Sequence, residues 1–504
     1  MKKLIRPLAF TAALGVAGVL GIGPLTADPP KAPPAPPATS PSDLPPRPLV
    51  EEPPMTPVKV TDTKTETKTA VDPKALSAAV KKSLEYLVKN QQEDGGWNQG
   101  GGWRTAIDPK AGGRVEGKNV EDPSDVGNTC FALLALFRAG STPSEGANKE
   151  NVSKGLKFIL TRVEKADKDS LYVTDVRNTQ LQSKIGPYVD TFLVNLVLAE
   201  MKGKAGTEEK RLTAALEKTM NKMVKHQDVN GGFANNGGWA PTLSVGIANK
   251  SFARAKQNGV AFDQKVLDRA LAQSKGAAAG TAMAGAPGAS TRAAGEGFAL
   301  GKPASGLSAS LPAPSGAGFG GGIGGGDAGV RLYSLGQGGG NSQDLINGLR
   351  VDGKKAEQVL KDSKATKEDK DKAAKTIDQL KTAEKDNDKV QLDLAKTVRD
   401  DRFVSGFGSN GGEEFLSFLN ISEALIIKGG KDWKDWDAKM ATGLEKAQDK
   451  DGSWSGQHCI TGKTFCTSAA LLVLMADRTQ FPVDALNVST KSNELKSEPA
   501  PEKK

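Results

Sequence analysis

Four acidic residues stand where apolar, helix-like stretches begin, and carboxylates placed in this way could hold a cation or carry a proton. Asp125 precedes VGNTCFALLALF, Asp190 lies near the start of VDTFLVNLVLAEM, and Glu413 and Glu414 open EEFLSFLNISEALIIKGG. A simpler interpretation is also open, because acids commonly cap helix N-termini and interact favourably with the helix dipole. The N-terminal end of a helix should lower the pKa of these carboxyls, which would make them poor proton donors.

His458, Cys459 and Cys466 place nitrogen and sulfur groups near the start of the last apolar stretch. Cys459 and Cys466 are seven positions apart in a loop that can turn back on itself. Together with the export predicted below, this spacing predicts a Cys459–Cys466 disulfide. Cys130, within an apolar helix, is expected to be a buried free thiol. The string GQHCITGKT is not a phosphate-binding loop, because Gln457 stands where that motif requires glycine.

The elements that must position these residues are helices of two alternating kinds. Stretches with one charged face, such as DPKALSAAVKKSLEYLVKNQ, alternate strictly with nearly apolar stretches, such as TFCTSAALLVLMAD. A half-polar helix covers a surface, whereas a helix that is apolar all round is buried. The alternation predicts an all-α fold with two concentric layers, in which about six helical hairpins close into an α/α toroid. The inner helices would start at one mouth of a central cavity.

Six residues are candidates for this cavity mouth. They are Asp125, Tyr188, Asp190, Glu413, Glu414 and His458. For Tyr188, packing within the fold is an equally open interpretation.

A short loop recurs three times between a half-polar helix and an apolar one. Its form is Gln-x-x-Asp/Asn-Gly-Gly/Ser-Trp/Phe, with the marked residues Gln91, Gly95 and Trp97; Gln227, Gly231 and Phe233; and Gln448, Gly452 and Trp454. A phosphate-binding loop would occur once and would follow a strand. We therefore interpret the loop as a structural joint. The glycine would end the helix in a left-handed turn, the glutamine would reach free helix-end groups, and the aromatic ring would fill the gap between helices.

The first of these loops resembles the QW motif of squalene–hopene and oxidosqualene cyclases, in the form Tyr86-Leu87-x-x-x-Gln91-x-x-x-Gly95-x-Trp97. The α/α toroid of those cyclases is shared with protein prenyltransferase β subunits. The block GSWSGQHCITGKTFCTSAALLVLM also resembles the last hairpin of exported bacterial proteins with prenyltransferase/squalene-cyclase repeats. The resemblance extends over residues 73–480 apart from an insertion, and it implies the toroid fold.

The chemistry of that superfamily is only partly represented in this chain. Triterpene cyclases use an Asp-x-Asp-Asp acid, and the sequence contains no such motif. Prenyltransferase β subunits bind zinc through an Asp, a Cys and a His. Here His458, Cys459 and Cys466 could be combined with Asp190 or Asp451, although the family's Asp-x-Cys has no matching form. No cofactor is therefore predicted, and zinc remains the alternative to the disulfide.

Composition divides the chain into six regions. They are a signal peptide (1–27), a Pro-rich and Thr/Lys-rich disordered linker (28–71), the toroid domain (72–480), a Gly/Ala-rich disordered insertion within it (276–326), a charged helical insertion within it (354–400) and a disordered tail (481–504). The formal net charge of +9 is spread over surfaces rich in both Lys and acidic residues. It predicts solubility and not nucleic-acid binding.

Three functions remain open at this point. The first is an exported toroid that binds a hydrophobic small molecule or an extended peptide in its central cavity without the standard cyclase chemistry. The second is an active terpenoid cyclase or prenyltransferase-like enzyme, and the third is a scaffold of the cell envelope. The missing motifs favour the first and third hypotheses.

The first 27 residues are expected to be removed on export. A basic start, a short apolar stretch and small residues before Asp28 are typical of a secretory signal. The mature protein would have no transmembrane helix and would be secreted or held in the periplasm or envelope, while an uncleaved N-terminal anchor would tether it. N-terminal sequencing of the exported protein should start near Asp28, and a chain that starts at Met1 would contradict this prediction.

Overall fold

The computed structural model describes the residues 57–61, 65–105, 114–116, 120–283, 331–400, 403 and 411–486. These residues are mainly helical, with short strands paired in three two-stranded sheets, so the predicted all-α class is confirmed. The signal peptide, most of the Pro-rich linker and most of the Gly/Ala-rich insertion lie outside the described residues.

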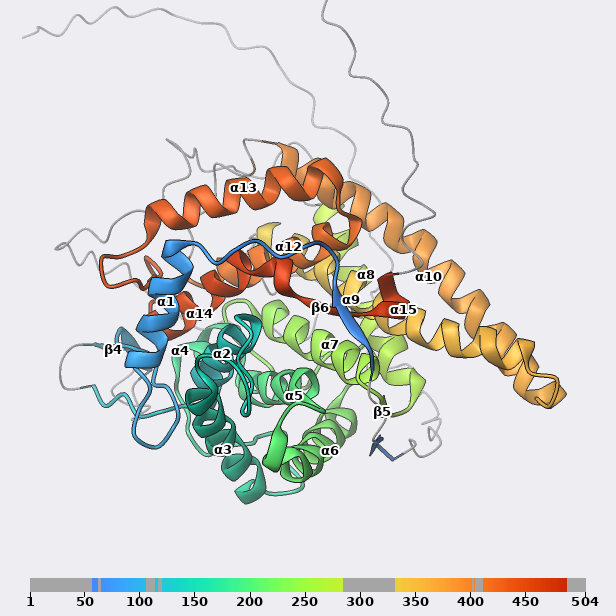
Figure 1. Ribbon diagram of the computed structural model, residues 1–504, viewed down its shortest axis with the longest axis horizontal. Helices are drawn as coiled ribbons and strands as arrows, with labels where there is room; N and C mark the ends of the chain where they lie inside the picture. Colours follow the sequence, from blue (N-terminus) through green and yellow to red (C-terminus); the bar gives the residue numbers. More distant parts are fainter. Residues whose placement is uncertain are drawn as a thin grey trace, which may run out of the picture. The chain divides into compact units, whose positions relative to one another are not determined.

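The helices alternate along the chain between a half-buried kind and a nearly fully buried kind (Figure 1). The half-buried helices are α1 (Ala78–Lys89), α3 (Lys149–Lys165), α6 (Glu209–His226), α8 (Gln264–Met283), α10 (Lys367–Arg399) and α13 (Gly430–Ala447). The buried helices are α2 (Val126–Arg138), α5 (Val189–Met201), α7 (Pro241–Gln257), α9 (Arg331–Lys361), α12 (Glu414–Lys428) and α14 (Lys463–Leu474). Apart from the C-terminal part of α9, their apolar and small residues leave no charged stripe that must face water.

The short elements complete the described chain. They are the helices α4 (Gln180–Ile185) and α15 (Val483–Leu486), the 3-10 turns η2 (Gly206–Glu208) and η3 (Ala476–Arg478), and the strands β1 (Lys59–Val60), β2 (Thr67–Thr69), β3 (Trp103–Thr105), β4 (Arg114–Glu116), β5 (Val260–Ala261) and β6 (Gln480–Pro482).

Each buried helix packs against the next buried helix along the chain. Contacts run from α2 to α5, α7, α9, α12 and α14, and α14 in turn contacts α2. The half-buried helices pack on the outside of these pairs, for example α3 on α2 and α13 on both α12 and α14. Glycine permits the closest approach, because a Cβ on Gly340 of α9 would lie 2.5 Å from the Cβ of Asn420 in α12.

Several buried helices begin at the same end of the structure. A Cβ on Gly127, the second residue of α2, would lie 2.8 Å from Oδ1 of Asp190, the second residue of α5. The N–H of Ile460, just before α14, donates to Glu413, just before α12, at 3.3 Å. The start of α2 therefore lies beside that of α5, and the start of α12 beside that of α14.

A network of buried charges joins later parts of these helices. Glu423 of α12 accepts hydrogen bonds from Lys250 and Arg254 of α7 and from Arg138, the last residue of α2. Asp344 of α9 pairs with Lys250 at 2.6 Å and with Arg254 at 3.1 Å. Burial alone would raise the pKa of Glu423, but the three surrounding cations hold it well below its ordinary range. Charge pairing thus links four of the buried helices.

The three recurrent loops fold into the same turn. In each, the N–H after the glutamine donates to the carbonyl four residues later, at 2.9 Å: Gln92 to Gly96, Asp228 to Gly232 and Asp449 to Ser453. The glycine of each loop has a left-handed φ: 87° at Gly95, 82° at Gly231 and 89° at Gly452. A Cβ at each would collide with a backbone carbonyl oxygen of α3, α8 or α1, respectively. These positions therefore require glycine for both conformation and space.

The glutamine of each loop reaches the first turn of the next half-buried helix. Gln91 Nε2 donates to the carbonyl of Asn151 in α3 at 2.9 Å, and Gln227 Nε2 donates to that of Val266 in α8 at 3.2 Å. Gln448 Nε2 donates to the carbonyl of Ala79 at 2.9 Å, which connects the end of α13 to the start of α1. The sequence predicted that the glutamine reaches free groups at a helix end. In the structure it instead bridges two neighbouring helices.

The tryptophans, and not the glutamines, bond to the last turn of the preceding helix. Trp97 Nε1 donates to the carbonyl of Leu87 in the last turn of α1, at 2.7 Å, and Trp454 Nε1 donates to that of Leu444 in the last turn of α13, at 2.9 Å. Both indoles are buried. They satisfy a last-turn carbonyl and fill the space between two helices at the same time.

The predicted disordered linker is ordered at its C-terminal end. Strand β1 pairs with β5, and β2 pairs with β6. Val58 is buried, so apolar contact and backbone pairing hold residues that the sequence placed in a linker ending at residue 71. The predicted tail is also corrected at its start, because β6 and α15 continue the described structure to Leu486.

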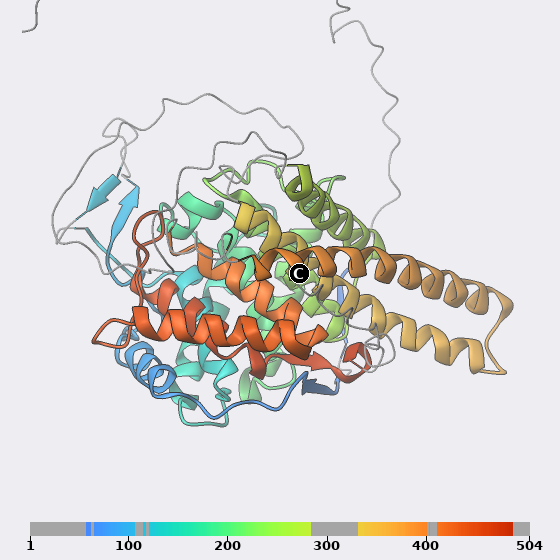
Figure 2. The same cartoon turned by 90° about the horizontal axis from the view of Figure 1, so that it is seen from above.

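The two predicted insertions have different boundaries in the structure. Helix α8 continues to Met283, so residues 276–283 are helical and not disordered. The segment 354–400 does not begin as a separate insertion, since α9 runs unbroken from its buried half to Lys361. Figure 2 shows the end of α9 and α10 side by side as a long antiparallel hairpin, so α10 is the half-buried partner of α9.

Truncation of the buried Trp454 to Ala should lower the free energy of unfolding by roughly 3–5 kcal/mol, because it leaves a large cavity. Trp454→Phe should cost less, about 1–3 kcal/mol, through loss of the bond to Leu444 and some packing. Urea denaturation followed by circular dichroism measures both changes.

The matched control for this prediction is Trp239→Ala, because the Trp239 side chain is 46% exposed. This change should cost less than about 1 kcal/mol. Equal losses at Trp454 and Trp239 would contradict a structural role for the loop.

Candidate functional site

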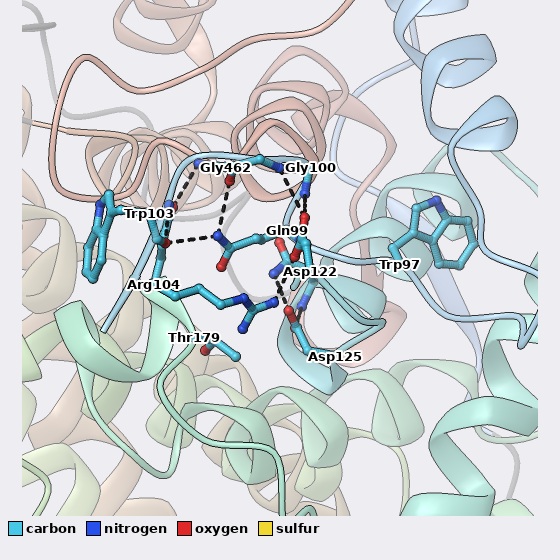
Figure 3. Close-up of polar contacts among 12 residues, drawn as sticks. Trp97, Gln99, Gly100, Trp103, Arg104, Asp122, Asp125, Thr179 and Gly462 are labelled. Atoms are coloured by element: carbon cyan, nitrogen blue, oxygen red, sulfur yellow. Dashed lines mark hydrogen bonds and ion pairs between the residues drawn. The ribbon is translucent and has the colours of Figure 1, made fainter. Parts of the chain in front are cut away.

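At the end where the buried helices begin, Gln180 connects the loops that precede α2 and α14. Its Oε1 accepts the N–H groups of Thr461 and Gly462 at 2.9 and 2.8 Å, and its Nε2 donates to the carbonyl of Trp103 at 2.9 Å. Trp103 Nε1 in turn donates to the carbonyl of Cys459 at 2.6 Å. Figure 3 shows Trp103 and Gly462 on this loop framework. The framework holds two segments more than 350 residues apart in fixed register.

An ion pair fixes the glycine-rich part of the same framework. Arg104 Nη2 lies 2.7 Å from Asp122 Oδ1, and Asp122 also accepts the N–H groups of Gln99, Gly100 and Gly101 at 3.1 Å (Figure 3). The amide of Gln99 donates back to the carbonyl of Gly101 at 3.1 Å. Two buried atoms of this set have no hydrogen-bond partner: Arg104 Nε and Gln99 Oε1.

Asp125 caps α2 and is almost fully buried. Its Oδ1 accepts the N–H of Asn128 at 2.8 Å, and its Oδ2 accepts the side-chain amide of Asn128 at 2.9 Å. Burial raises the pKa of Asp125 to about 6, and the bonds from Asn128 and the charge of Arg104 offset this only in part. The capping interpretation is therefore correct for Asp125, but the expected lowering of its pKa is wrong.

Asp190, in the first turn of α5, has the higher pKa of the two aspartates. Its Oδ2 accepts the amide of Gln182 at 2.6 Å, and the carboxylate also accepts a hydrogen bond from the backbone N–H of Gly127. Burial and the nearby charge of Asp125 raise the pKa of Asp190 to about 7. Desolvation outweighs the helix dipole here, because the dipole effect is small compared with the cost of burying a charge. Asp190 can therefore carry a proton near neutral pH and donate a hydrogen bond.

Glu413 and Glu414 form a second group, around the start of α12. Glu413 is fully buried, and its Oε2 accepts the N–H of Ile460 at 3.3 Å. Tyr333 of α9 is fully buried, and burial, the charges of Glu413 and Glu414, and a hydrogen bond with Glu413 raise the pKa of Tyr333 far above its ordinary value. The structure thus divides the acids into an Asp125–Asp190 pair and a Glu413–Glu414 pair.

Tyr188 and His458 take simpler roles. The ring of Tyr188 packs 5.0 Å from that of Tyr172 and 6.5 Å from that of Phe192. The Nδ1 of His458 lies 3.0 Å from Sγ of its neighbour Cys459. Packing therefore accounts for Tyr188, which had been a candidate for the cavity mouth.

The predicted disulfide is not present. In the part of the chain that the structure describes, Cys130, Cys459 and Cys466 are buried and form no disulfide, and Sγ of Cys466 lies 3.7 Å from the carbonyl oxygen of Ile460. Burial, as the main cause, raises the pKa of Cys466 well above its ordinary value, so this sulfur is held as a thiol. A loop that can turn back on itself does not by itself bring two sulfurs to bonding distance.

The alternative zinc ligands are not assembled either. Asp451 pairs with Lys463 at 2.8 Å, and Asp190 is held by Gln182. Among the residues that the structure describes, no group of three His, Cys, Asp or Glu side chains is placed to hold a metal ion. No zinc-dependent step is therefore derived for this protein.

Four polar residues of this end were not identified from the sequence: Gln99, Arg104, Asp122 and Gln180. A signal for the first three existed in the run Gly100–Gly102, where all three glycines have a left-handed φ. Such a loop needs side chains that accept its exposed N–H groups, and Asp122 does this. Nothing in the local sequence marks Gln180, whose partners are 77 and about 281 residues away.

Comparison with known proteins identifies no relative: no family model matches the chain, and no curated protein matches it significantly. None of the helices in the described ranges is long and apolar enough to cross a membrane.

Asp190→Asn should flatten the dependence of stability on pH. The raised pKa values mean that the folded protein binds more protons than the unfolded chain between about pH 4 and pH 7, so its stability falls as the pH rises through this window. The variant should match the parent near pH 4.5 and exceed it at pH 8 by roughly 2–4 kcal/mol. Urea denaturation at several pH values measures this.

Asp388→Asn on the exposed face of α10 is the matched control and should keep the slope of the parent. An Asp190→Asn profile that is parallel to the parent profile would show that Asp190 is ionised throughout.

Proposed function

We propose that this chain is an exported α/α toroid that binds an extended polar ligand, such as a peptide segment, at the end where its buried helices begin. The closed series of contacts from α2 through α14 and back to α2 supports the toroid, and so does the outer position of the half-buried helices. The bridge from Gln448 to α1 supports closure of the outer layer. The superfamily of the squalene cyclases and prenyltransferases remains the proposed relationship, on the strength of the QW-like loops.

The observation that carries the binding proposal is a set of buried polar atoms without partners at this end. They are Gln99 Oε1, Arg104 Nε and Asn128 Oδ1. Each such group costs about 1–3 kcal/mol when it is left unpaired, so a ligand that pairs with them would recover that free energy. The set contains both donors and acceptors, which suits the alternating N–H and C=O groups of a peptide better than an apolar molecule.

The enzyme alternative has one supporting observation. Asp190 can be protonated near neutral pH, as a general acid would require. The sequence lacks the Asp-x-Asp-Asp motif, so a cyclase would need a different acid from the one its proposed relatives use. Binding is the better supported function because it accounts for the three unpartnered atoms, whereas proton donation by Asp190 involves none of them.

Native mass spectrometry of the purified chain, mixed with a library of polar dodecapeptides, tests the binding proposal directly. Peptide adducts are expected, and Asn128→Leu should weaken their affinity by at least tenfold, because it removes an unpartnered acceptor. Asp388→Asn should bind like the parent. Adducts of small apolar molecules in place of peptides would support the enzyme alternative, and equal binding by Asn128→Leu would place the ligand elsewhere.

A further inference from the structure

A separate cavity of about 560 Å³ lies where α2, α5 and α7 end. Residues from the last turns of these helices form its inner wall, and residues of β2 and β6 form its outer wall. Strand β2 pairs antiparallel with β6, so the two strands on this side belong to one small sheet. The volume lies within the range of about 300–1,000 Å³ that is typical of small-molecule sites. This cavity is distinct from the end that carries the acidic residues discussed above.

The inner wall has unsatisfied polar atoms of both kinds. Arg254 and Gln257, which are 2% and 1% exposed, both line the cavity. Arg254 Nε has no acceptor, and Gln257 Oε1 has no donor. Glu200, also in the wall, lies 3.8 Å from Arg254 Nε, which is too far for a direct hydrogen bond. A ligand with one acceptor and two donor hydrogens could pair with all three groups.

The charges of the wall are divided in the same way. Arg138 and Arg254 are already balanced by Glu423 and Asp344 in the buried network. Glu200 adds a carboxylate with free acceptor capacity at the end of α5, whose terminal carbonyls, like those of α2 and α7, favour a positive group. Arg478, from η3, adds a guanidinium to the outer side of the cavity. One part of the cavity therefore favours a cation and another part favours an anion.

We propose that this cavity binds a small zwitterion, a free α-amino acid or a dipeptide. The ammonium group would lie against Glu200 and Gln257 Oε1, and the carboxylate would lie toward Arg254 Nε and Arg478. Phe137, Pro73 and Pro482 provide apolar wall for the rest of the ligand.

The outer wall connects this site to the N-terminal strap, residues 65–77, which includes β2. Thr67, Thr69 and Pro73 of the strap line the cavity, and Thr65 Oγ1 donates to the carbonyl of Gln257 at 2.7 Å. Because the strap forms part of the site, an occupied cavity should hold the strap more firmly. The site thus depends on residues from both ends of the described chain, since β6 supplies the opposing strand.

Thermal unfolding and isothermal titration calorimetry of the full chain test the proposal with the twenty common L-amino acids and Ala-Ala. At least one zwitterion is expected to raise the Tm and to bind, while its N-acetyl amide, which lacks both charges, should not. Glu200→Gln and Arg478→Gln should each weaken binding by tenfold or more. Amide exchange of residues 65–77 should slow when the ligand is bound.

Two controls keep the test decisive. Asp388→Asn, remote from the cavity, should bind like the parent, and circular dichroism should show that the Glu200 and Arg478 variants remain folded. Absence of binding by every zwitterion, equal binding of the N-acetyl amide, or parent-like affinity of both cavity variants would overturn the proposal. Binding of dodecapeptides at the other end is measured separately with Asn128→Leu, so either result can fail alone.

Discussion

The buried charge network around Glu423 is the interaction on which the arrangement of the helices depends. Its carboxylate accepts bonds from Arg138 in α2 and from Lys250 and Arg254 in α7. Asp344 of α9 pairs with the same two residues of α7. A buried pair gains little over apolar packing, but removal of one partner leaves a charge that costs about 3–5 kcal/mol. Such a network favours one register of the four helices over all others, because a shift of one turn would separate every pair.

The buried acidic groups at the two ends of the buried helices lie in different surroundings. Where the network lies, the charges of Arg138, Lys250, Asp344 and Glu423 are paired with one another. Where the helices begin, several buried atoms have no partner, and two aspartates have pKa values raised toward neutrality. The free energy gained by close packing elsewhere offsets the cost of these unpaired buried groups. Unpaired groups of this kind are typical of a site that meets a ligand.

The sequence by itself determined the order and the kind of the helices, and it located the three recurrent loops. Both signals are local: a helix reveals its buried face within a few turns, and a left-handed glycine followed by an aromatic residue marks a helix end. Asp125 could likewise be identified as a cap, because a cap needs only the three residues that follow it. The partner of Gln91 could not, since Asn151 lies 60 residues away.

Only the tertiary structure decided which distant residues meet and how strongly they are buried. Lys250 and Glu423 are 173 residues apart in the sequence, and β2 and β6 lie near opposite ends of the described chain. No local sequence pattern therefore predicts either contact. The pKa of Asp190 was misjudged because the sequence shows the helix dipole but not the desolvation, which is the larger effect. Cys459 and Cys466 are close in sequence, yet the structure forms no disulfide between them. Residues that are close in the sequence are able to meet, but the packing of the fold decides whether they do.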